Sequence, residues 1–410
     1  MPLRTWTASQ GGITVETTDP DREEPVMDQR ADHPAGPAVT QVELLRAAMP
    51  FSAGRRVRGE ETVDEYNASS QSFTRMEALM VRVTDASGAV GWGEAFGHRV
   101  NPATWAALEH LVAPFVLGRP ADPEAVRPDS EYAFHAFGRT GPVHYAVSAL
   151  DTALWDLAAQ RAGAPLRRLL NPQAGDVVDC YASLVHYGED PTEVAHHVAR
   201  AQQAGYRAFK LHESTPEAVG AAREQAGAEA VLMTDVNCRW DEAGADAALR
   251  ALAPYELRWL EEPVFPPDDA ATMARLNGRH GRVSAGENAS GVAGMVEQMR
   301  AGAVEVAQPS VGKIGGISGM REVIAAGAEL GVDVVPHNFY CGPALNATAQ
   351  LLAGLLPDAQ LEVPFLQWPQ RLHALHGAGP SITLDETPGL GFAPDEQVLQ
   401  DHLLASTVIA

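Results

Sequence analysis

Cysteine is scarce in this sequence. Its three cysteines, Cys180, Cys238 and Cys341, lie far apart, and no two of them form a CxxC pair. This spacing argues against a disulfide framework and against a structural zinc site, since both need cysteines in sets of close spacing. A chain without such crosslinks fits a reducing compartment, so we expect a cytoplasmic protein.

Positive charge is also in short supply. The 410 residues include 30 Lys and Arg against 53 Asp and Glu, which gives a formal net charge of −23. Such a chain argues against nucleic acid and anionic membranes as partners, because both carry negative charge themselves. A small anionic substrate is not excluded, since a cluster of cations or a metal ion can reverse the field inside a cleft.

The N-terminal region lacks long apolar runs. Residues 1–25 contain no stretch long enough for a signal peptide or a membrane span. Residues 1–38 are rich in Asp, Glu, Pro, Gly and Thr and show no apolar periodicity. This composition predicts a flexible acidic extension that cannot bury a core.

The next segment carries two kinds of periodicity. Residues 39–95 have a β-like pattern, and the alternation on both sides of residues 85–88 predicts a β-hairpin. Residues 144–163 have apolar side chains at helical spacing, and Gly163, followed by Pro165, ends the predicted helix. We therefore expect an α+β domain over residues 39–165, followed by something larger.

From Cys180 onward one pattern repeats. Short apolar runs, each ending in a polar or charged residue, alternate with alanine-rich helical segments. Seven of these runs, spaced 23 to 27 residues apart, end at Lys210, Asp235, Glu261, Glu287, Ser310, His337 and Glu362. This spacing suits a repeating unit of one strand and one helix. With the initial run CYASL the strands number eight, which is the count that closes a (β/α)8 barrel.

Three carboxylates end successive runs of this predicted barrel. Asp235, Glu261 and Glu287 would meet at the C-terminal ends of neighbouring strands, where barrel enzymes place their active sites. Three like charges at one point destabilise a fold unless a cation neutralises them. An all-oxygen set suits Mg²⁺ and gives no reason to prefer zinc. The sequence therefore predicts a magnesium site.

Basic side chains flank this predicted site. Lys210 and His212 are two residues apart, so both point into the barrel from one strand. His337 ends the seventh strand and would face His212 across the substrate, so that one imidazole removes a proton while the other donates one. Asn237, on the same face as Asp235, either binds substrate or is a structural amide.

These residues carry a family resemblance. The chain resembles the mandelate racemase subgroup of the enolase superfamily in the order of its strand-end motifs. These motifs are K-x-H, the three carboxylates, the KIGG segment, and the last His and Glu. The resemblance covers about residues 40–400 and includes the segments GWGEAFG and ALDTALWDLAA. It implies a modified TIM barrel over residues 175–374. It also implies that the α+β domain, completed by residues from about 375 to 410, caps this barrel.

The resemblance also implies roles for the site residues. Asp235, Glu261 and Glu287 would hold the metal, Lys210 would lie near the substrate carboxylate, and His212 and His337 would perform acid/base work. A proton next to a carboxylate is too weakly acidic for an unaided side-chain base. Mg²⁺, Lys210 and, if protonated, Glu362 could stabilise the two negative oxygens of the resulting enediolate.

The sequence departs from the subgroup at one position. Ser310 stands where an Asp usually partners the His of strand seven, and a serine can orient an imidazole but cannot stabilise its positive charge. We therefore predict a less basic His337. Lys313 is a second candidate on that side, either as a substrate-binding base or as a partner in a salt bridge.

The leading hypothesis is a dehydratase that converts an aldonate or aldarate sugar acid to a 2-keto acid. A 2-hydroxy-acid racemase or epimerase, a cycloisomerase and a barrel without catalysis are the alternatives. The expected partner is a small-molecule carboxylate. Arg55, Arg56 and Arg58, in the loop GRRVRGEETVDEY, could contact its distal carboxylate or hydroxyls. The family resemblance suggests a homo-oligomer, either a dimer or an octamer.

Overall fold

The computed structural model describes residues 36–55 and 74–410. The extension predicted over residues 1–38 lies outside this part except for its last three residues, and so do Arg56 and Arg58. Contacts group the described residues into one compact unit. In the described part, no helix is long and apolar enough to cross a membrane.

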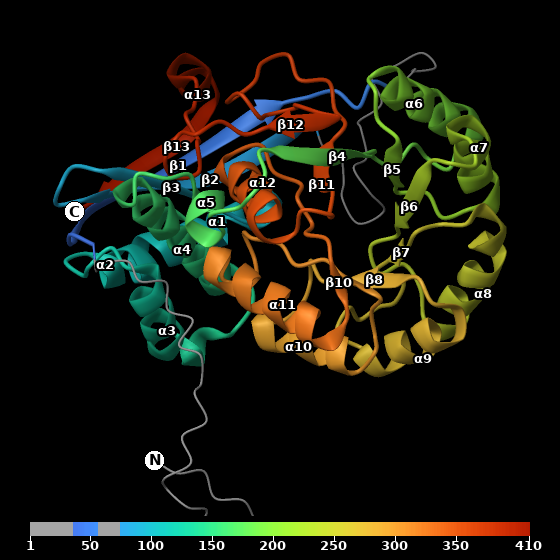
Figure 1. Ribbon diagram of the computed structural model, residues 1–410, viewed down its shortest axis with the longest axis horizontal. Helices are drawn as coiled ribbons and strands as arrows, with labels where there is room; N and C mark the ends of the chain where they lie inside the picture. Colours follow the sequence, from blue (N-terminus) through green and yellow to red (C-terminus); the bar gives the residue numbers. More distant parts are fainter. Residues whose placement is uncertain (1–35, 56–73) are drawn as a thin grey trace, which may run out of the picture. The chain divides into compact units, whose positions relative to one another are not determined.

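The N-terminal part is built on a four-stranded antiparallel sheet (Figure 1). Its strand order is β13-β1-β2-β3, and its strands are β1 (Val39–Pro50), β2 (Arg75–Asp85), β3 (Val90–Ala95) and β13 (Leu403–Ile409). The hairpin predicted around residues 85–88 is confirmed by the pairing of β2 with β3. The last strand of the chain pairs with the first, so both ends of the described chain contribute to this sheet.

Helices follow this sheet, and the longest of them packs against it. They are η1 (His98–Val100), α1 (Asn101–Ala107), η2 (Leu108–Val112), α2 (Ala113–Val116), α3 (Pro123–Ala133), η3 (His135–Phe137), α4 (Pro142–Arg161) and α5 (Leu166–Leu170). Strand β3 approaches α4 closely, since a Cβ added at Gly93 would lie 1.9 Å from the carbonyl oxygen of Ala149. Glycine is thus needed where the strand crosses the helix.

The larger part contains eight parallel strands, which confirms the predicted count. They are β4 (Val177–Ser183), β5 (Ala208–Leu211), β6 (Val231–Asp235), β7 (Leu260–Glu261), β8 (Val283–Ala285), β9 (Val306–Ala307), β10 (Asp333–Val334) and β11 (Leu361–Pro364). They follow one another around a curled sheet in the order β10-β9-β8-β7-β6-β5-β4-β11. A short strand, β12 (Ser381–Thr383), adds to β4 in the antiparallel sense.

Helices cover the outside of the curled sheet (Figure 1). They are α6 (Pro191–Gln203), α7 (Pro216–Ala226), α8 (Glu242–Leu252), α9 (Ala270–His280), α10 (Gly291–Arg300), α11 (Gly316–Leu330) and α12 (Pro343–Leu355), with the short element η4 (Ala253–Tyr255). The last helix, α13 (Glu396–His402), contacts β1 of the N-terminal sheet instead. Local sequence signals start several of them. The side chains of Asp190, Thr215, Asp241 and Asp269 accept backbone N–H groups of the first turns of α6 to α9.

Side chains span the gap between the first and last strands of this sheet. In the described chain no backbone ladder joins β10 to β11. Instead, the backbone N–H of Asn338 donates to Glu362 Oε2 at 2.8 Å, and its side-chain amide donates to the Glu362 carbonyl at 2.9 Å. The expected barrel is therefore present in a modified form, closed at this point by one asparagine.

The interior of the barrel is layered. Ala208, Met233 and Trp259 belong to a buried apolar cluster inside it. Two residues further along the same three strands come Lys210, Asp235 and Glu261, which share the inward face because strand side chains alternate. An apolar layer thus supports a layer of charges near the C-terminal ends of the strands.

Candidate active site

Lys210 is the centre of the charged layer. Its side chain is buried, and Nζ lies 2.7 Å from Glu362 Oε1, 3.3 Å from Glu261 Oε2 and 3.7 Å from Asp235 Oδ2. These contacts join the ends of β5, β6, β7 and β11. The structure therefore brings together four residues that the sequence separates by as many as 152 positions.

The electrostatics of this layer follow from burial and from close charges. Burial alone would lower the pKa of Lys210, but the attraction of Glu261 and Glu362 raises it well above its usual value. Burial would raise the pKa of Glu362, yet Lys210 lowers it to about 2. Glu362 is therefore ionised, so it cannot be the protonated hydrogen-bond donor considered from the sequence.

The two carboxylates at the ends of β6 and β7 behave in the opposite way. Burial, opposed by Lys210 and reinforced by Asp235, raises the pKa of Glu261 to about 8. Burial also raises the pKa of Asp235 well above its usual value, with Glu287 adding to the effect. Burial therefore disfavours the ionised form of both side chains, and a bound cation would favour that form.

The two candidate acid/base histidines contact different carboxylates. His212 Nδ1 lies 3.9 Å from Asp235 Oδ2, whereas His337 Nε2 lies 2.8 Å from Glu287 Oε2. Both side chains are buried. Burial, with a further contribution from Lys210, lowers the pKa of His212 to about 3, so its imidazole is neutral at pH 7.

Ser310 does not orient His337 in the way the sequence allowed. Its hydroxyl shares a hydrogen bond of 2.5 Å with the hydroxyl of Tyr340. Nδ1 of His337 has no hydrogen-bond partner in the described part of the chain. The two residues meet only through a backbone bridge. The basicity of His337 stays a prediction.

A cavity of about 800 Å³ opens beside this layer, between the N-terminal sheet with its loops and the barrel. Five of the predicted site residues line it: Asp235, Asn237, Glu287, Lys313 and His337. The other five, Lys210, His212, Glu261, Ser310 and Glu362, are not in its lining and are buried. Of these, Lys210 and His212 both contact Asp235, which does line the cavity.

Asn237 and Lys313 are both held by neighbours. The backbone N–H of Asn237 donates to Asp235 Oδ1 at 2.9 Å, so this residue fixes a carboxylate as well as lining the cavity. Lys313 donates to Asn288 Oδ1 at 3.2 Å, and Nζ lies 3.9 Å from the centre of the Phe96 ring. No salt bridge joins Lys313 to a carboxylate among the residues described.

Two residues of the cavity wall escaped the sequence reasoning. Glu262 and Asn288 directly follow two predicted metal ligands, and the amide of Asn288 donates to both oxygens of Glu262 at 3.0 and 2.9 Å. Glu262 lines the cavity because its backbone has φ 47°, a left-handed conformation that turns it away from strand geometry. The doubled Glu in LEEP was the signal, but the φ angle is not readable from it.

The oxygen atoms of the three predicted metal ligands suit a hard divalent cation. Asp235, Glu261 and Glu287 offer carboxylate oxygens, the ligands that Mg²⁺ prefers. In the described residues no three His, Cys, Asp or Glu side chains already stand in a metal-binding arrangement. Lys210 and His337 contact these carboxylates instead.

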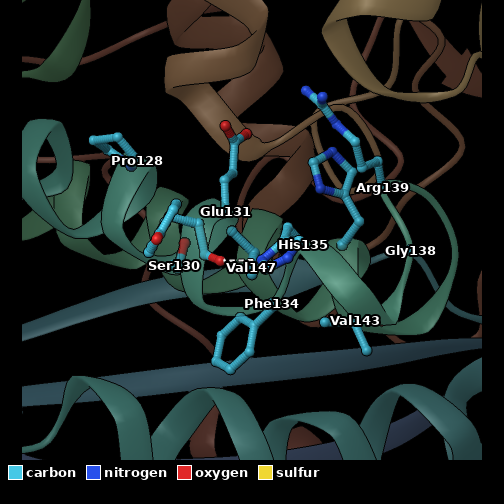
Figure 2. Close-up of a pocket in the computed structure, with 11 residues that line it drawn as sticks. Pro128, Ser130, Glu131, Phe134, His135, Gly138, Arg139, Val143 and Val147 are labelled. Carbon is cyan, nitrogen blue, oxygen red and sulfur yellow. Dashed lines mark hydrogen bonds between the residues drawn. The ribbon is translucent and has the colours of Figure 1, made fainter.

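A second, smaller cavity lies in the N-terminal part, between α3 and α4 (Figure 2). It measures about 280 Å³, and Glu131, Phe134, Arg139 and Val143 are among its lining residues. None of the predicted site residues lines it. The candidate active site is therefore the barrel cavity.

Comparison with known proteins agrees with this geometry. The chain matches two family models: the Mandelate racemase / muconate lactonizing enzyme, N-terminal domain, over residues 57–171, and Enolase C-terminal domain-like over residues 193–398. Together they cover most of the chain.

Curated relatives include sugar-acid enzymes. A 3,6-anhydro-alpha-L-galactonate cycloisomerase of Streptomyces coelicolor is 33% identical over 258 residues, which cover 61% of this chain and 71% of the relative. A D-gluconate dehydratase of Thermoproteus tenax is 29% identical over 405 residues, which cover 89% and 80%.

Solved structures share the fold. The crystal structure of a racemase from Streptomyces coelicolor with bound magnesium superposes with a TM-score of 0.78 at 26% identity, over 89% of this chain and 100% of that one. The same family is indicated by the order of the strand-end residues, by the barrel with its N-terminal sheet, and by both family models. The chain belongs to the enolase superfamily, in its mandelate racemase and muconate lactonizing enzyme group.

Proposed function

We propose that this protein is a Mg²⁺-dependent dehydratase of sugar acids. It would remove the proton next to the carboxylate of an aldonate or aldarate and expel the neighbouring hydroxyl as water, giving a 2-keto acid. One observation carries the proposal. Two buried imidazoles, His212 and His337, contact two different carboxylates of a cluster that also holds a buried lysine. A base and an acid on two sides of one carboxylate-binding centre are what an elimination needs.

The metal would be held by Asp235, Glu261 and Glu287. When bound, Mg²⁺ supplies Lewis-acid stabilisation of the negative charge that develops on the substrate carboxylate. The raised pKa values of Asp235 and Glu261 support a cation here, because burial disfavours their charged forms and a positive charge beside them would offset that cost. The magnesium in the racemase structure at 26% identity also supports it.

The protein's own side chains would move the protons. Neutral His212 accepts the proton from the α-carbon, and the electrons of that C–H bond pass to the carboxylate, where Lys210 stabilises them. His337, protonated, then gives its proton to the β-hydroxyl as the C–O bond breaks and water leaves. The resulting enol gains a proton at the β-carbon and loses its hydroxyl proton to solvent, which gives the 2-keto acid.

A sugar-acid library tests this proposal. The protein with Mg²⁺ is incubated with aldonates and aldarates, and products are detected with semicarbazide and by mass spectrometry. The expected product has lost the mass of one water and reacts as a 2-keto acid. Unchanged mass, with deuterium from D₂O appearing at the α-carbon, would replace the dehydratase by a racemase or epimerase.

A cycloisomerase is the second candidate, and Lys313 favours it. This lysine lines the cavity on the side of His337, where it could transfer a proton during ring opening or closure. The relative at 33% identity is a cycloisomerase by name. A product of unchanged mass in which NMR shows a ring gained or lost would establish this alternative. A protein that binds no Mg²⁺ in a calorimetric titration would overturn all three reactions.

A further inference from the structure

The two sides of the active-site cavity differ in charge. From the barrel, Asp235, Glu262 and Glu287 contribute carboxylates. From the N-terminal part, three arginines line the same cavity, Arg46, Arg75 and Arg99, with one carboxylate, Glu77; Lys313 adds a positive charge from the barrel. Once a cation occupies the carboxylate side, the arginine side remains as a separate positive patch.

Arg46 is already neutralised. Its Nε lies 2.8 Å from Glu77 Oε2 and its second nitrogen donates to Oε1 at 3.0 Å, so the pair is bidentate. The amide of Asn101 donates to the same carboxylate at 3.1 Å. This arginine has a partner of its own and is not the one that needs an anion.

Arg75 and Arg99 have no such partner. Within the residues that the structure describes, neither side chain makes a hydrogen bond or an ion pair, and both residues are exposed. Their backbones are nevertheless fixed. Arg75 pairs with Pro50 at the start of the β1–β2 ladder, and Arg99 lies in the turn η1, which His98 opens with φ 59°. Both residues thus line the cavity from elements whose backbone positions are set by the fold.

Of the three loop arginines expected for this task from the sequence, Arg56 and Arg58 lie outside the described residues, and Arg55 faces elsewhere. Arg55 donates to the carbonyl of His186 and lies 5.9 Å from the centre of the Tyr187 ring. It is not in the cavity lining. Among the described residues of the N-terminal part, the unpaired arginines of the cavity wall are therefore those of β2 and η1.

We propose that Arg75 and Arg99 bind a second carboxylate, at the end of the substrate away from the reacting carbon. The preferred substrate is then an aldarate, a sugar acid with a carboxylate at both ends, and not an aldonate. This inference rests on the proposed function for its chemistry at the first carboxylate. A chain with net charge −23 repels a dianion unless local cations offset the field, and this arginine pair supplies them.

The size of the effect follows from the interaction. A hydrogen bond between charged groups contributes about 1.5–3 kcal/mol, which corresponds to about tenfold to a hundredfold in affinity. An arginine can bind a carboxylate with two parallel bonds. Each substitution should therefore reduce the preference for the aldarate by at least about tenfold.

Matched substrate pairs test the subsite. Galactarate and galactonate, and glucarate and gluconate, differ only in whether the distal carbon is a carboxylate or a hydroxymethyl group. The variants are Arg75→Gln, Arg99→Gln and the double variant, with Arg119→Gln as control. Arg119 also belongs to the N-terminal part, but it pairs with Asp129 and does not line the cavity. Turnover gives kcat/KM, and calorimetry of the Mg²⁺-loaded protein gives affinity without needing turnover.

Wild type and the control should prefer the aldarate, and the double variant should lose about a hundredfold or more of that ratio. A wild type that prefers the aldonate, or a double variant in which both acids weaken alike, overturns the subsite. If no sugar acid is turned over but the aldarate still binds through the arginines, the reaction is wrong and the subsite stands. If the wild type binds neither acid, both are overturned.

Discussion

The substitution Glu362→Gln tests the central ion pair of the barrel. The buried carboxylate of Glu362 accepts hydrogen bonds from Lys210 Nζ at 2.7 Å, from Ser183 Oγ at 2.7 Å and from the backbone N–H of Asn338 at 2.8 Å. Glutamine keeps the shape but removes the charge and turns one oxygen into an N–H₂ donor. Whichever way the amide is oriented, that donor then meets another donor, because donors approach both oxygens.

The expected cost is about 3 kcal/mol of unfolding free energy. Removing one member of a buried ion pair costs about 3–5 kcal/mol, because the partner is left with an uncompensated charge. Here the lower end applies, since Lys210 keeps Glu261 at 3.3 Å and Asp235 at 3.7 Å. The loss should therefore be large but should not prevent folding.

Urea unfolding followed by tryptophan fluorescence measures this difference. The matched control is Ser183→Ala, which removes a single hydrogen bond to the same carboxylate and leaves its charge in place. Such a bond contributes about 1.5 kcal/mol or somewhat more. If Glu362→Gln lowers stability no more than Ser183→Ala, the charge on Glu362 is not what holds Lys210, and the electrostatic account of the barrel layer is wrong.

Three further predictions concern the acid, the packing of the N-terminal sheet and the pH dependence of stability. His337→Asn should reduce formation of the 2-keto acid on the order of a hundredfold or more in the semicarbazide assay, and unchanged turnover would remove His337 from the mechanism. Gly93→Ala places a Cβ 1.9 Å from a helix carbonyl and should cost about 3 kcal/mol in urea unfolding, whereas Gly175→Ala, with open space around it, should cost far less. Burial lowers the pKa of His376 from 6.5 to about 3, so between these values the unfolded chain binds a proton that the folded chain does not. The free energy of unfolding should therefore fall by about 1.4 kcal/mol for each unit by which the pH is lowered through this range. His376→Gln should remove this contribution from the measured slope, and an identical slope would contradict it.

The sequence by itself determined the barrel and the identity of its strand-end residues. A strand, a helix and two loops occupy a nearly constant length, so the repeat is visible without any knowledge of contacts. The C-terminal ends of parallel strands meet at one edge, so Asp235 and Glu261 could be placed side by side from their order alone. The hairpin of β2 and β3 and the helix α4 could also be predicted from the sequence, because the periodicity of each is a local pattern.

Tertiary structure decided which side chains face the cavity and what they contact. Ser310 bonds to Tyr340, and Glu262 enters the cavity wall through a left-handed backbone angle. The unpaired arginines in the described cavity wall come from β2 and η1, far away along the chain, and Arg55 of the predicted loop contacts another part of the barrel. Such outcomes depend on contacts between segments distant in sequence and on competition among nearby partners for each polar group. Local periodicity carries no information about either, so only the folded chain could decide them.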